Sequence, residues 1–349
     1  MSRMPAPRND RKREKLATVL TLVVVAIWLA GQKACAHDGS ARHNKADEQI
    51  AKITEHLKDE PEDADAIRER AYLYATVNEE YESGLADFDR LLQLKPKSQV
   101  ARANRGLERS KTGDWKGAAA DLDAVCSAST TVPVAWFARA ELRRNVGDLA
   151  GARTDIDRAL ELHQWGAAYV LSAEVHEARG DLAGALGDYD KALGKDPRHL
   201  DALAGRATVY ASQGKYAEAT RDIDTALEIA KEDARPHAAR ARCFQKQGFQ
   251  DAAKREADIA VSAYQKEAKQ SRSQHRAAES LLYAARLVLD ATKDAKGALA
   301  LLDDALSLAP DRIDLLREKV RILDSLGQKD APSDTVRKKL ADVESSRLP

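Results

Sequence analysis

The chain has 349 residues, of which 32% are charged and 5% are aromatic, and its formal net charge at pH 7 is zero. With few aromatic side chains and no basic tract after its first residues, it lacks the positive surface and stacking rings typical of nucleic-acid binding. Charges of both signs are interspersed with plentiful alanine, as in extended helical proteins with a large surface. We therefore expect a helical protein that does not bind nucleic acid.

Residues 1–36 have the features of an export signal. Six of the first 15 residues are basic, residues 16–30 are apolar, and Ala34 and Ala36 flank Cys35 as the small residues that a signal peptidase reads. The apolar run is shorter than the roughly 20 residues of a spanning helix. We expect a cleaved signal peptide, with an uncleaved N-terminal membrane anchor as the alternative. Either way the rest of the chain lies outside the cytoplasm, as a periplasmic, secreted or membrane-anchored protein. If the segment is not cleaved, we expect membrane contact only through residues 16–30.

The next segment contains one isolated helix. Ile50, Ile53 and Leu57 recur at spacings of three and four, which predicts an amphipathic helix within residues 46–61. We interpret this helix as an N-terminal cap of the fold and the polar residues 37–45 as a linker.

A pattern with a period of 33 or 34 residues then runs through the chain. An acidic–hydrophobic–acidic triplet begins at Asp87, Asp121, Asp155, Asp188 and Asp222, with a degraded copy at Glu256. Turn glycines keep the same register at Gly113, Gly147, Gly180, Gly214 and Gly248. An arginine before a small residue does so too, at Arg70, Arg105, Arg139, Arg206 and Arg240. Three markers in one register indicate a repeat protein.

Residues 200–229 show the repeat unit most clearly. Leu203, Ala207 and Tyr210 share one face of a first helix. Gly214 ends that helix, because glycine adopts the left-handed conformation of many C-terminal caps. A second helix has the same spacings, with Tyr216, Ala219, Ile223 and Ala226. Such a hairpin cannot bury its apolar stripe alone, so it needs stacked neighbours.

This period and pattern resemble the tetratricopeptide repeat family. The family's small residue, tyrosine, turn glycine, second aromatic and two alanines are matched by Ala207, Tyr210, Gly214, Tyr216, Ala219 and Ala226. Its closing proline and early tryptophan are matched in other repeats by Pro96, Pro197, Pro310 and Trp136, whereas its usual leucine before the small residue is an arginine here. The resemblance covers about 300 residues. It implies an all-α solenoid, a right-handed superhelix of antiparallel helix pairs.

We expect six repeats over residues 64–263, at approximately 64–97, 99–131, 133–165, 166–199, 200–233 and 234–263. The polar insertion 264–274 then shifts the phase. A longer helix in the sixth repeat explains this shift, and a hinge or docking loop is the alternative. Residues 279–345 contain a seventh repeat and a partial repeat that caps the C-terminal end.

The paired aspartates do not predict a metal site, because residues two apart on a helix point about 200° from each other. We expect them to form a ladder of ion pairs with the repeating arginines, within and between repeats. Exposed pairs of this kind contribute about 0–1 kcal/mol each. In the fourth repeat Ser172 takes the arginine position beside Asp188 and Asp190, so we expect an incomplete ladder there.

The sequence contains no catalytic, metal-binding or cofactor-binding constellation. The histidines are scattered, and His176-Glu177 lacks the second histidine of a zinc-protease helix. Cys126 and Cys243 lie in the second and sixth repeats, too far apart for a disulfide because solenoid repeats touch only their neighbours. We therefore predict two buried structural thiols and a protein that is not an enzyme and holds no cofactor or metal.

The resemblance also implies a binding groove on the concave face, lined by first-helix residues that point away from the second helices. Carried over repeat by repeat, these are Leu107, Lys111, Val134, Phe137, Glu141, Arg144, Val170, Leu171, Glu174 and Glu177. The apolar members either dock a partner or pack against adjacent first helices. Members of the family that bind heat-shock chaperones hold the chaperone's C-terminal carboxylate with a clamp of lysines and asparagines. Of those positions, Asn104 is nearly the only one matched here, which disfavours such a ligand.

From these observations we expect an exported, non-catalytic scaffold that binds a protein or peptide partner in the concave groove. The alternative is a self-associating structural component of an envelope or membrane complex. An enzyme is the least expected class.

Overall fold

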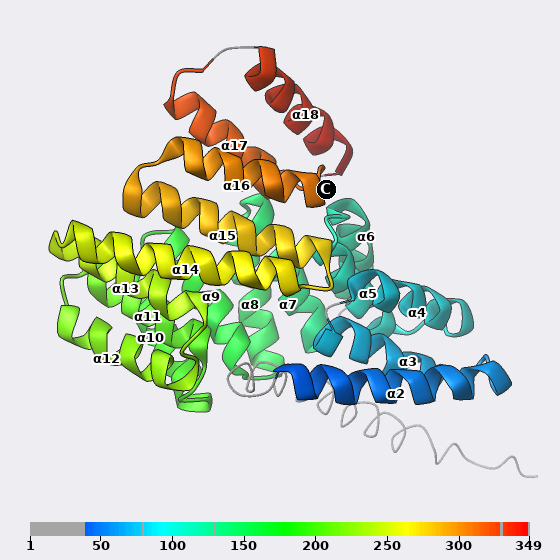
Figure 1. Ribbon diagram of the computed structural model, residues 1–349. Helices are drawn as coiled ribbons and strands as arrows, with labels where there is room; N and C mark the ends of the chain where they lie inside the picture. The colour runs from blue at the N-terminus through cyan, green and yellow to red at the C-terminus, as the bar shows by residue number, and fades with distance from the viewer. Residues whose placement is uncertain (1–38, 79, 129, 329–330, 348–349) are drawn as a thin grey trace, which may run out of the picture.

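The computed structural model describes residues 39–78, 80–128, 130–328 and 331–347 (Figure 1). Within these segments the chain forms helices and no strands. The expected all-α solenoid is confirmed. After α2 (Gly39–Asp59) come eight antiparallel pairs: α3 (Ala64–Leu73, extended by the π-helical turn η1, Tyr74–Asn78) with α4 (Tyr81–Leu94), α5 (Gln99–Lys111) with α6 (Trp115–Cys126), α7 (Pro133–Val146) with α8 (Leu149–Leu162), α9 (Gly166–Ala178) with α10 (Leu182–Lys195), α11 (Leu200–Ser212) with α12 (Tyr216–Ile229), α13 (Ala234–Gln247) with α14 (Gln250–Gln270), α15 (Gln274–Thr292) with α16 (Ala295–Leu308), and α17 (Ile313–Ser325) with α18 (Ala331–Arg347).

The turn within each hairpin is encoded locally. After α7, Gly147 has a φ of 94°, a left-handed conformation that glycine adopts without strain. The next residue, Asp148, caps α8, because its side chain accepts a hydrogen bond of 2.8 Å from the backbone N–H of Gly151. The same glycine–aspartate pair ends the first helix and begins the second helix in other repeats, so the chain reverses direction at these points.

The N-terminal helix α2 differs from the sequence-based prediction at its start. Residues 39–45, expected to be part of a linker, are helical, because the sequence from Ser40 to Asp59 contains no glycine or proline that would break the helix. The amphipathic part is as expected, since Ile50 and Leu57 are buried. The predicted signal peptide or anchor, residues 1–36, lies outside the described residues.

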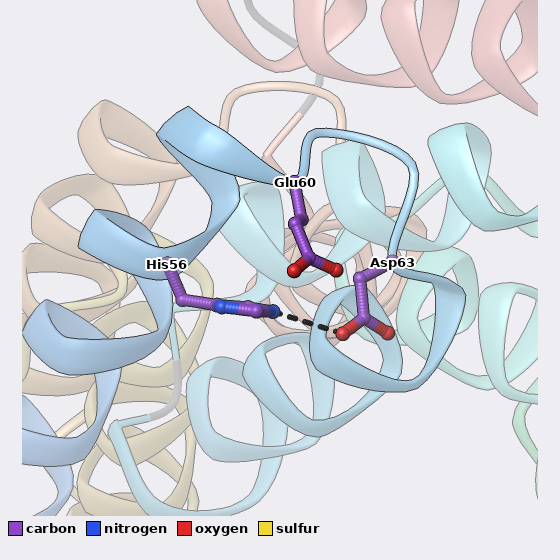
Figure 2. A group of neighbouring side chains, drawn as sticks. All are labelled: His56, Glu60 and Asp63. Atoms are coloured by element: carbon purple, nitrogen blue, oxygen red, sulfur yellow. Dashed lines mark hydrogen bonds and ion pairs between the residues drawn. The ribbon is translucent and has the colours of Figure 1, made fainter.

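The end of α2 is joined to α3 by a small polar cluster (Figure 2). Asp63 caps α3 by accepting hydrogen bonds of 3.0 and 3.1 Å from the N–H groups of Asp65 and Ala66. Its other carboxylate oxygen lies 2.9 Å from Nε2 of His56. This contact raises the pKa of His56 and lowers the pKa of Asp63. The pair therefore joins the last turn of the capping helix to the start of the first repeat.

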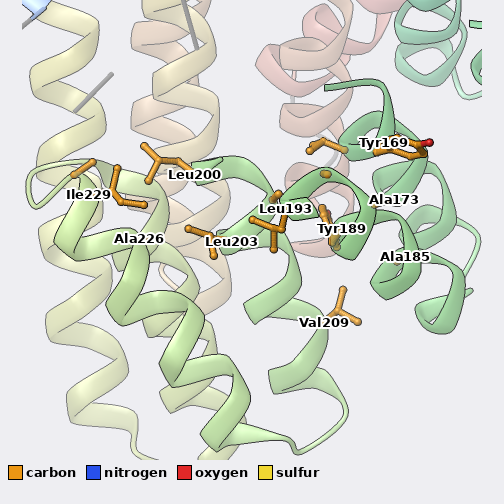
Figure 3. Packing of buried hydrophobic residues seen from close by; sticks show 14 residues of the cluster. Tyr169, Ala173, Ala185, Tyr189, Leu193, Leu200, Leu203, Val209, Ala226 and Ile229 are labelled. Carbon is orange, nitrogen blue, oxygen red and sulfur yellow. The ribbon is translucent and has the colours of Figure 1, made fainter. Parts of the chain in front are cut away.

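The core is a series of layers between neighbouring hairpins (Figure 3). In the layer that joins α9 and α10 to α11 and α12, the large side chains Tyr189 and Leu203 fill the space between small ones. Ala173, Ala185 and Ala226 are fully buried, so the helix backbones approach closely there. Because each layer needs the next hairpin, the hairpins stabilise one another in sequence.

A glycine in this layer gives a test of its packing. A Cβ atom on Gly205 would lie 2.3 Å from the hydroxyl oxygen of Tyr189. The ring of Tyr189 is buried, and its hydroxyl donates a 2.5 Å hydrogen bond to Glu177. We expect Gly205→Ala to lower the free energy of unfolding by about 1–3 kcal/mol, measured by urea denaturation. Gly187→Ala, in a helix with nothing within 4 Å of the added atom, should instead stabilise by about 0.5–1 kcal/mol. Equal effects of the two substitutions would contradict this packing.

The arginines and aspartates form the expected ladder. Arg139 donates to both oxygens of Asp155 in its own repeat, at 2.8 and 2.7 Å, and to Asp123 of the preceding repeat at 3.0 Å. Arg105 and Arg206 make the same contacts in their repeats. The first aspartate of each triplet is buried and the second is exposed, so the ladder is half-buried rather than fully exposed.

In the fourth repeat the ladder lacks its bidentate arginine, as predicted. Ser172 donates a 2.5 Å hydrogen bond to Asp188, and Arg153 of α8 donates to Ser172 at 2.9 Å. Arg153 also lies 3.7 Å from Asp188 and 2.8 Å from Asp157. A guanidinium from the neighbouring second helix thus approaches Asp188, but among the described residues no arginine donates a hydrogen bond to it, so the ladder is incomplete in this repeat.

The polar insertion 264–274 is mostly helical. Helix α14 runs to Gln270 and has 21 residues, whereas the second helices of the preceding repeats have 12 to 14. The next helix, α15, begins at Gln274, before the predicted start of the seventh repeat at 279, and has 19 residues. The interpretation as a longer helix in the sixth repeat is therefore confirmed, and the extension continues into the seventh.

The two cysteines in the described part of the chain are as predicted. Cys126 and Cys243 are both buried free thiols. Burial raises the pKa of Cys126 to about 11 and also raises the pKa of Cys243. Both groups are therefore protonated and unreactive near neutral pH.

Candidate partner-binding face

The predicted face centres on Arg144, near the end of α7. Arg144 forms an ion pair with Glu174 of α9. Its guanidinium also interacts electrostatically with Glu141 of α7 and with Glu279 and Tyr283 of α15. Residues from the third, fourth and seventh repeats are therefore brought to one place by the curvature of the superhelix.

The carboxylates of this face are solvent-accessible but surrounded by protein. Glu174 exposes 40% of its side chain and Arg144 exposes 29%. Nevertheless, burial raises the pKa of Glu141 and of Glu174, and the negative charge of Glu279 raises both further. This combination fits side chains whose tips reach water while most of their surroundings are protein.

The polar face continues into later repeats. Asp201 of α11 pairs with Arg235 of α13 at 2.6 Å, and Arg235 also pairs with Asp233 at 2.6 Å. Arg276 of α15 lies 3.2 Å from Glu279, and the charge of Arg276 helps to lower the pKa of Asp201. Charges of both signs therefore alternate along the face.

The apolar members of the predicted groove are packed in the core. Phe137 lies 5.6 Å from Trp165, centroid to centroid, in a cluster that also contains Leu171. Val170 belongs to the layer shown in Figure 3. Leu107 and the half-buried Val134 belong to a cluster that includes Ile313, Leu316 and Val343 of the C-terminal hairpin. Of the two interpretations of the apolar strip, the structure thus shows packing against neighbouring helices.

The polar members lie in different surroundings. Lys111 lies over the ring of Tyr81, 5.1 Å from its centroid. Glu177 accepts the hydrogen bond from Tyr189, and burial raises its pKa. The carboxylate of Glu141 makes no hydrogen bond or ion pair with any residue that the structure describes. Whether these residues bind a partner stays a prediction.

Several residues of this face were missed by sequence reasoning. Glu279, Tyr283 and Arg276 occupy a first helix, as the predicted residues do, but the insertion 264–274 moves them out of the repeat register. Asp201 and Arg235 occupy first helices that are in register, so extending the same assignment to the fifth and sixth repeats would have found them.

One group outside this face has metal-ligating side chains. His56, Glu60 and Asp63 place one ligand atom each within 4.8 Å of one another. However, Asp63 already caps α3 and pairs with His56, and all three lie on an open surface. We assign these residues to the α2–α3 junction rather than to a metal.

The unpaired carboxyl of Glu141 predicts a pH-dependent stability. Its folded-state pKa is raised by burial, so the folded state binds the proton more tightly than the unfolded state. Stability is then lost as pH rises from the ordinary glutamate value through the folded-state pKa. We expect Glu141→Gln to be more stable than the wild type at pH 7.5, with the difference in urea midpoint vanishing below about pH 4. Glu228→Gln, an exposed glutamate of α12, should show no such difference; equal profiles for the two variants would rule out the raised pKa.

Comparisons with known proteins agree with this architecture, an α-solenoid of stacked helical hairpins. A tetratricopeptide repeat family model matches residues 177–243. The crystal structure of the APC/C hetero-tetramer Cut9-Hcn1 is similar with a TM-score of 0.50 and 13% identity, over 82% of this chain and 54% of that chain. A tetratricopeptide repeat protein from Parabacteroides merdae ATCC 43184 is similar with a TM-score of 0.49 and 16% identity, over 74% of this chain and 98% of that chain. No curated protein matches the sequence.

The in-phase repeat pattern and the helical hairpins agree with this family match, so the chain contains tetratricopeptide repeats. Repeats of this class stack into extended surfaces that bind other proteins. None of the helices in the described segments is long and apolar enough to cross a membrane.

Proposed function

We propose that this protein is a non-catalytic scaffold that binds a protein or peptide segment on the face around Arg144. The observation that carries this proposal is the convergence of accessible charged side chains from α7, α9 and α15 around Arg144. The occupant we expect is a charged, polar segment rather than an apolar helix, because the apolar side chains of the predicted groove are already packed.

The side chains of this face favour binding over catalysis. They are carboxylates, guanidinium groups and a tyrosine, with no serine or cysteine nucleophile beside a base among them. Arg144 pairs with Glu174 and Arg276 pairs with Glu279, and such groups can exchange their partners for those of a ligand without chemical turnover. We further propose that the protein acts outside the cytoplasm, because residues 1–36 have the features of an export signal.

Charge reversal tests the binding face. Arg144→Glu should reduce the amount of partner retained on the immobilised protein at least about tenfold, as expected when a desolvated charge pair is broken. The matched control is Arg158→Glu on the second helix α8, where the side chain is exposed, and it should retain the partner. Circular dichroism of both variants shows whether the fold is intact. Equal retention by the two folded variants would contradict the proposal.

Intact mass tests the location. The protein recovered from a cell-envelope fraction should begin at His37 if the signal is cleaved, or at Met1 in the membrane fraction if it remains as an anchor. Full-length protein in the cytosol would contradict export. If the mass of the pure protein in solution rises with concentration and no foreign partner is captured, the self-associating structural role replaces the scaffold.

A further inference from the structure

The extension created by residues 264–274 has a contact that a longer helix alone does not explain. Helices α14 and α15 project together beyond the length of the earlier hairpins, and the short loop between them contains Arg272. This loop lies next to α2 and the start of α4, at the other end of the sequence (Figure 1). The sixth and seventh repeats thus reach the first repeat and its capping helix.

Arg272 makes this contact with two carboxylates. Its guanidinium binds both oxygens of Asp47 in α2, at 2.9 Å each, and lies 3.2 Å from Glu80 at the start of α4. These carboxylates raise the pKa of Arg272 further above its usual range. Nearby, His275 lies 3.9 Å from Glu82. The N-terminal side of the contact is therefore acidic and the α14–α15 side is basic.

A second contact closes the superhelix at its C-terminal end. Ile313 and Leu316 of α17 and Val343 of α18 share an apolar cluster with Leu107 and Trp115 of the second repeat. Arg317 donates a 3.4 Å hydrogen bond to the backbone carbonyl of Asn145, at the end of α7. The chain therefore completes one turn and packs on itself at two places, one ionic and one apolar.

We propose that the extended α14–α15 hairpin is a clasp that holds the superhelix closed on its first repeat, and that release of the Arg272 contact opens a path to the Arg144 face. The apolar contact keeps the C-terminal hairpin in place, while α2, α3 and α4 move away from the clasp. The Arg272 pairs are solvent-exposed and therefore weak and sensitive to salt. A contact of that strength makes closure reversible.

Distance measurement tests the clasp. Exposed positions on its two sides are Glu48 and Lys269. In a Cys35→Ala background, cysteines there can carry spin labels while Cys126 and Cys243 stay buried and unlabelled. In the full chain at low salt we expect one short, narrow distance distribution. Arg272→Glu should increase the population at longer distances about fivefold, and the double variant Arg272→Glu with Asp47→Arg should recover much of the short distance.

Labelling of the inner face tests its accessibility. In the same background, Tyr283→Cys places a thiol on α15 beside Arg144, and its reaction rate with a bulky maleimide should rise about fivefold when Arg272→Glu is added. Arg158→Glu, an exposed charge reversal on α8, should change neither distance nor rate. The proposal is overturned if Arg272→Glu leaves the distance distribution unchanged, or if the distance lengthens without faster labelling. Neither measurement needs a partner, so the outcome is independent of the proposed function.

Discussion

Replacing Arg139 with alanine should lower the free energy of unfolding by about 3 kcal/mol, the lower end of the cost of breaking a buried ion pair. The reason is Asp155, whose side chain has 0% exposure and would lose two of its three hydrogen bonds from guanidinium groups. Arg143 keeps its 2.8 Å contact with Asp155, which is why the upper end of the range is not reached. Urea denaturation of the two proteins at pH 7 measures the difference.

The matched control for Arg139 is Arg158→Ala, which removes an exposed pair with Glu161 on the same hairpin. Its cost should stay within about 1 kcal/mol. A double-mutant cycle of Arg139 and Asp123 isolates the pair between repeats, where Asp123 is exposed, and this coupling should also be below about 1 kcal/mol. An Arg139→Ala variant as stable as Arg158→Ala would show that the ladder has no energetic role.

The features that could be predicted from the sequence are those that depend on neighbouring residues. Gly147 and Asp148 end one helix and begin the next through contacts within a few residues, so the glycines repeated in register from Gly113 to Gly248 locate five of the hairpins. The pairing of Arg139 with Asp155 spans 16 residues inside one hairpin and repeats with it. Such contacts follow directly from the repeat.

The features that could not be predicted depend on the curvature accumulated over many repeats. The contact of Arg272 with Asp47 joins residues 225 apart, and no periodic pattern specifies it. The approach of Tyr283 to Arg144 has the same origin. In the fourth repeat, Arg153 approaches Asp188 from a different helix, because a buried carboxylate needs a cation but does not specify which helix supplies it.

The apolar residues of the predicted groove show the same limit of prediction from a repeat pattern. Helix periodicity places Phe137 and Leu171 on faces that point away from their second helices, but it does not show what covers them. In the structure, Trp165 and neighbouring first helices cover both side chains. Of the residues predicted to line the groove, only the charged ones therefore remain candidates for binding a partner. The structure adds Arg276, Glu279 and Tyr283 of α15 to them.

Introducing a carboxylate at position 137 should therefore unfold the middle repeats rather than only weaken binding. Phe137 is 4% exposed and packs against Trp165. Phe137→Glu removes a buried aromatic side chain and places a charge without a partner in the core, so we expect a loss of about 4 kcal/mol or more. The measurement is the urea midpoint, followed by tryptophan fluorescence and by circular dichroism.

Two controls separate packing from exposure in this experiment. Phe137→Leu keeps the site apolar and should cost roughly 1–2 kcal/mol. Phe249→Glu changes a phenylalanine that is 57% exposed and should stay within about 0.5 kcal/mol of the wild type. If Phe137→Glu instead unfolds at the wild-type midpoint, the side chain of Phe137 is accessible in solution, and the docking interpretation of the apolar strip replaces the packing one. The charged face around Arg144 would then have an apolar neighbour, and the expected partner would change from a polar segment to an amphipathic one.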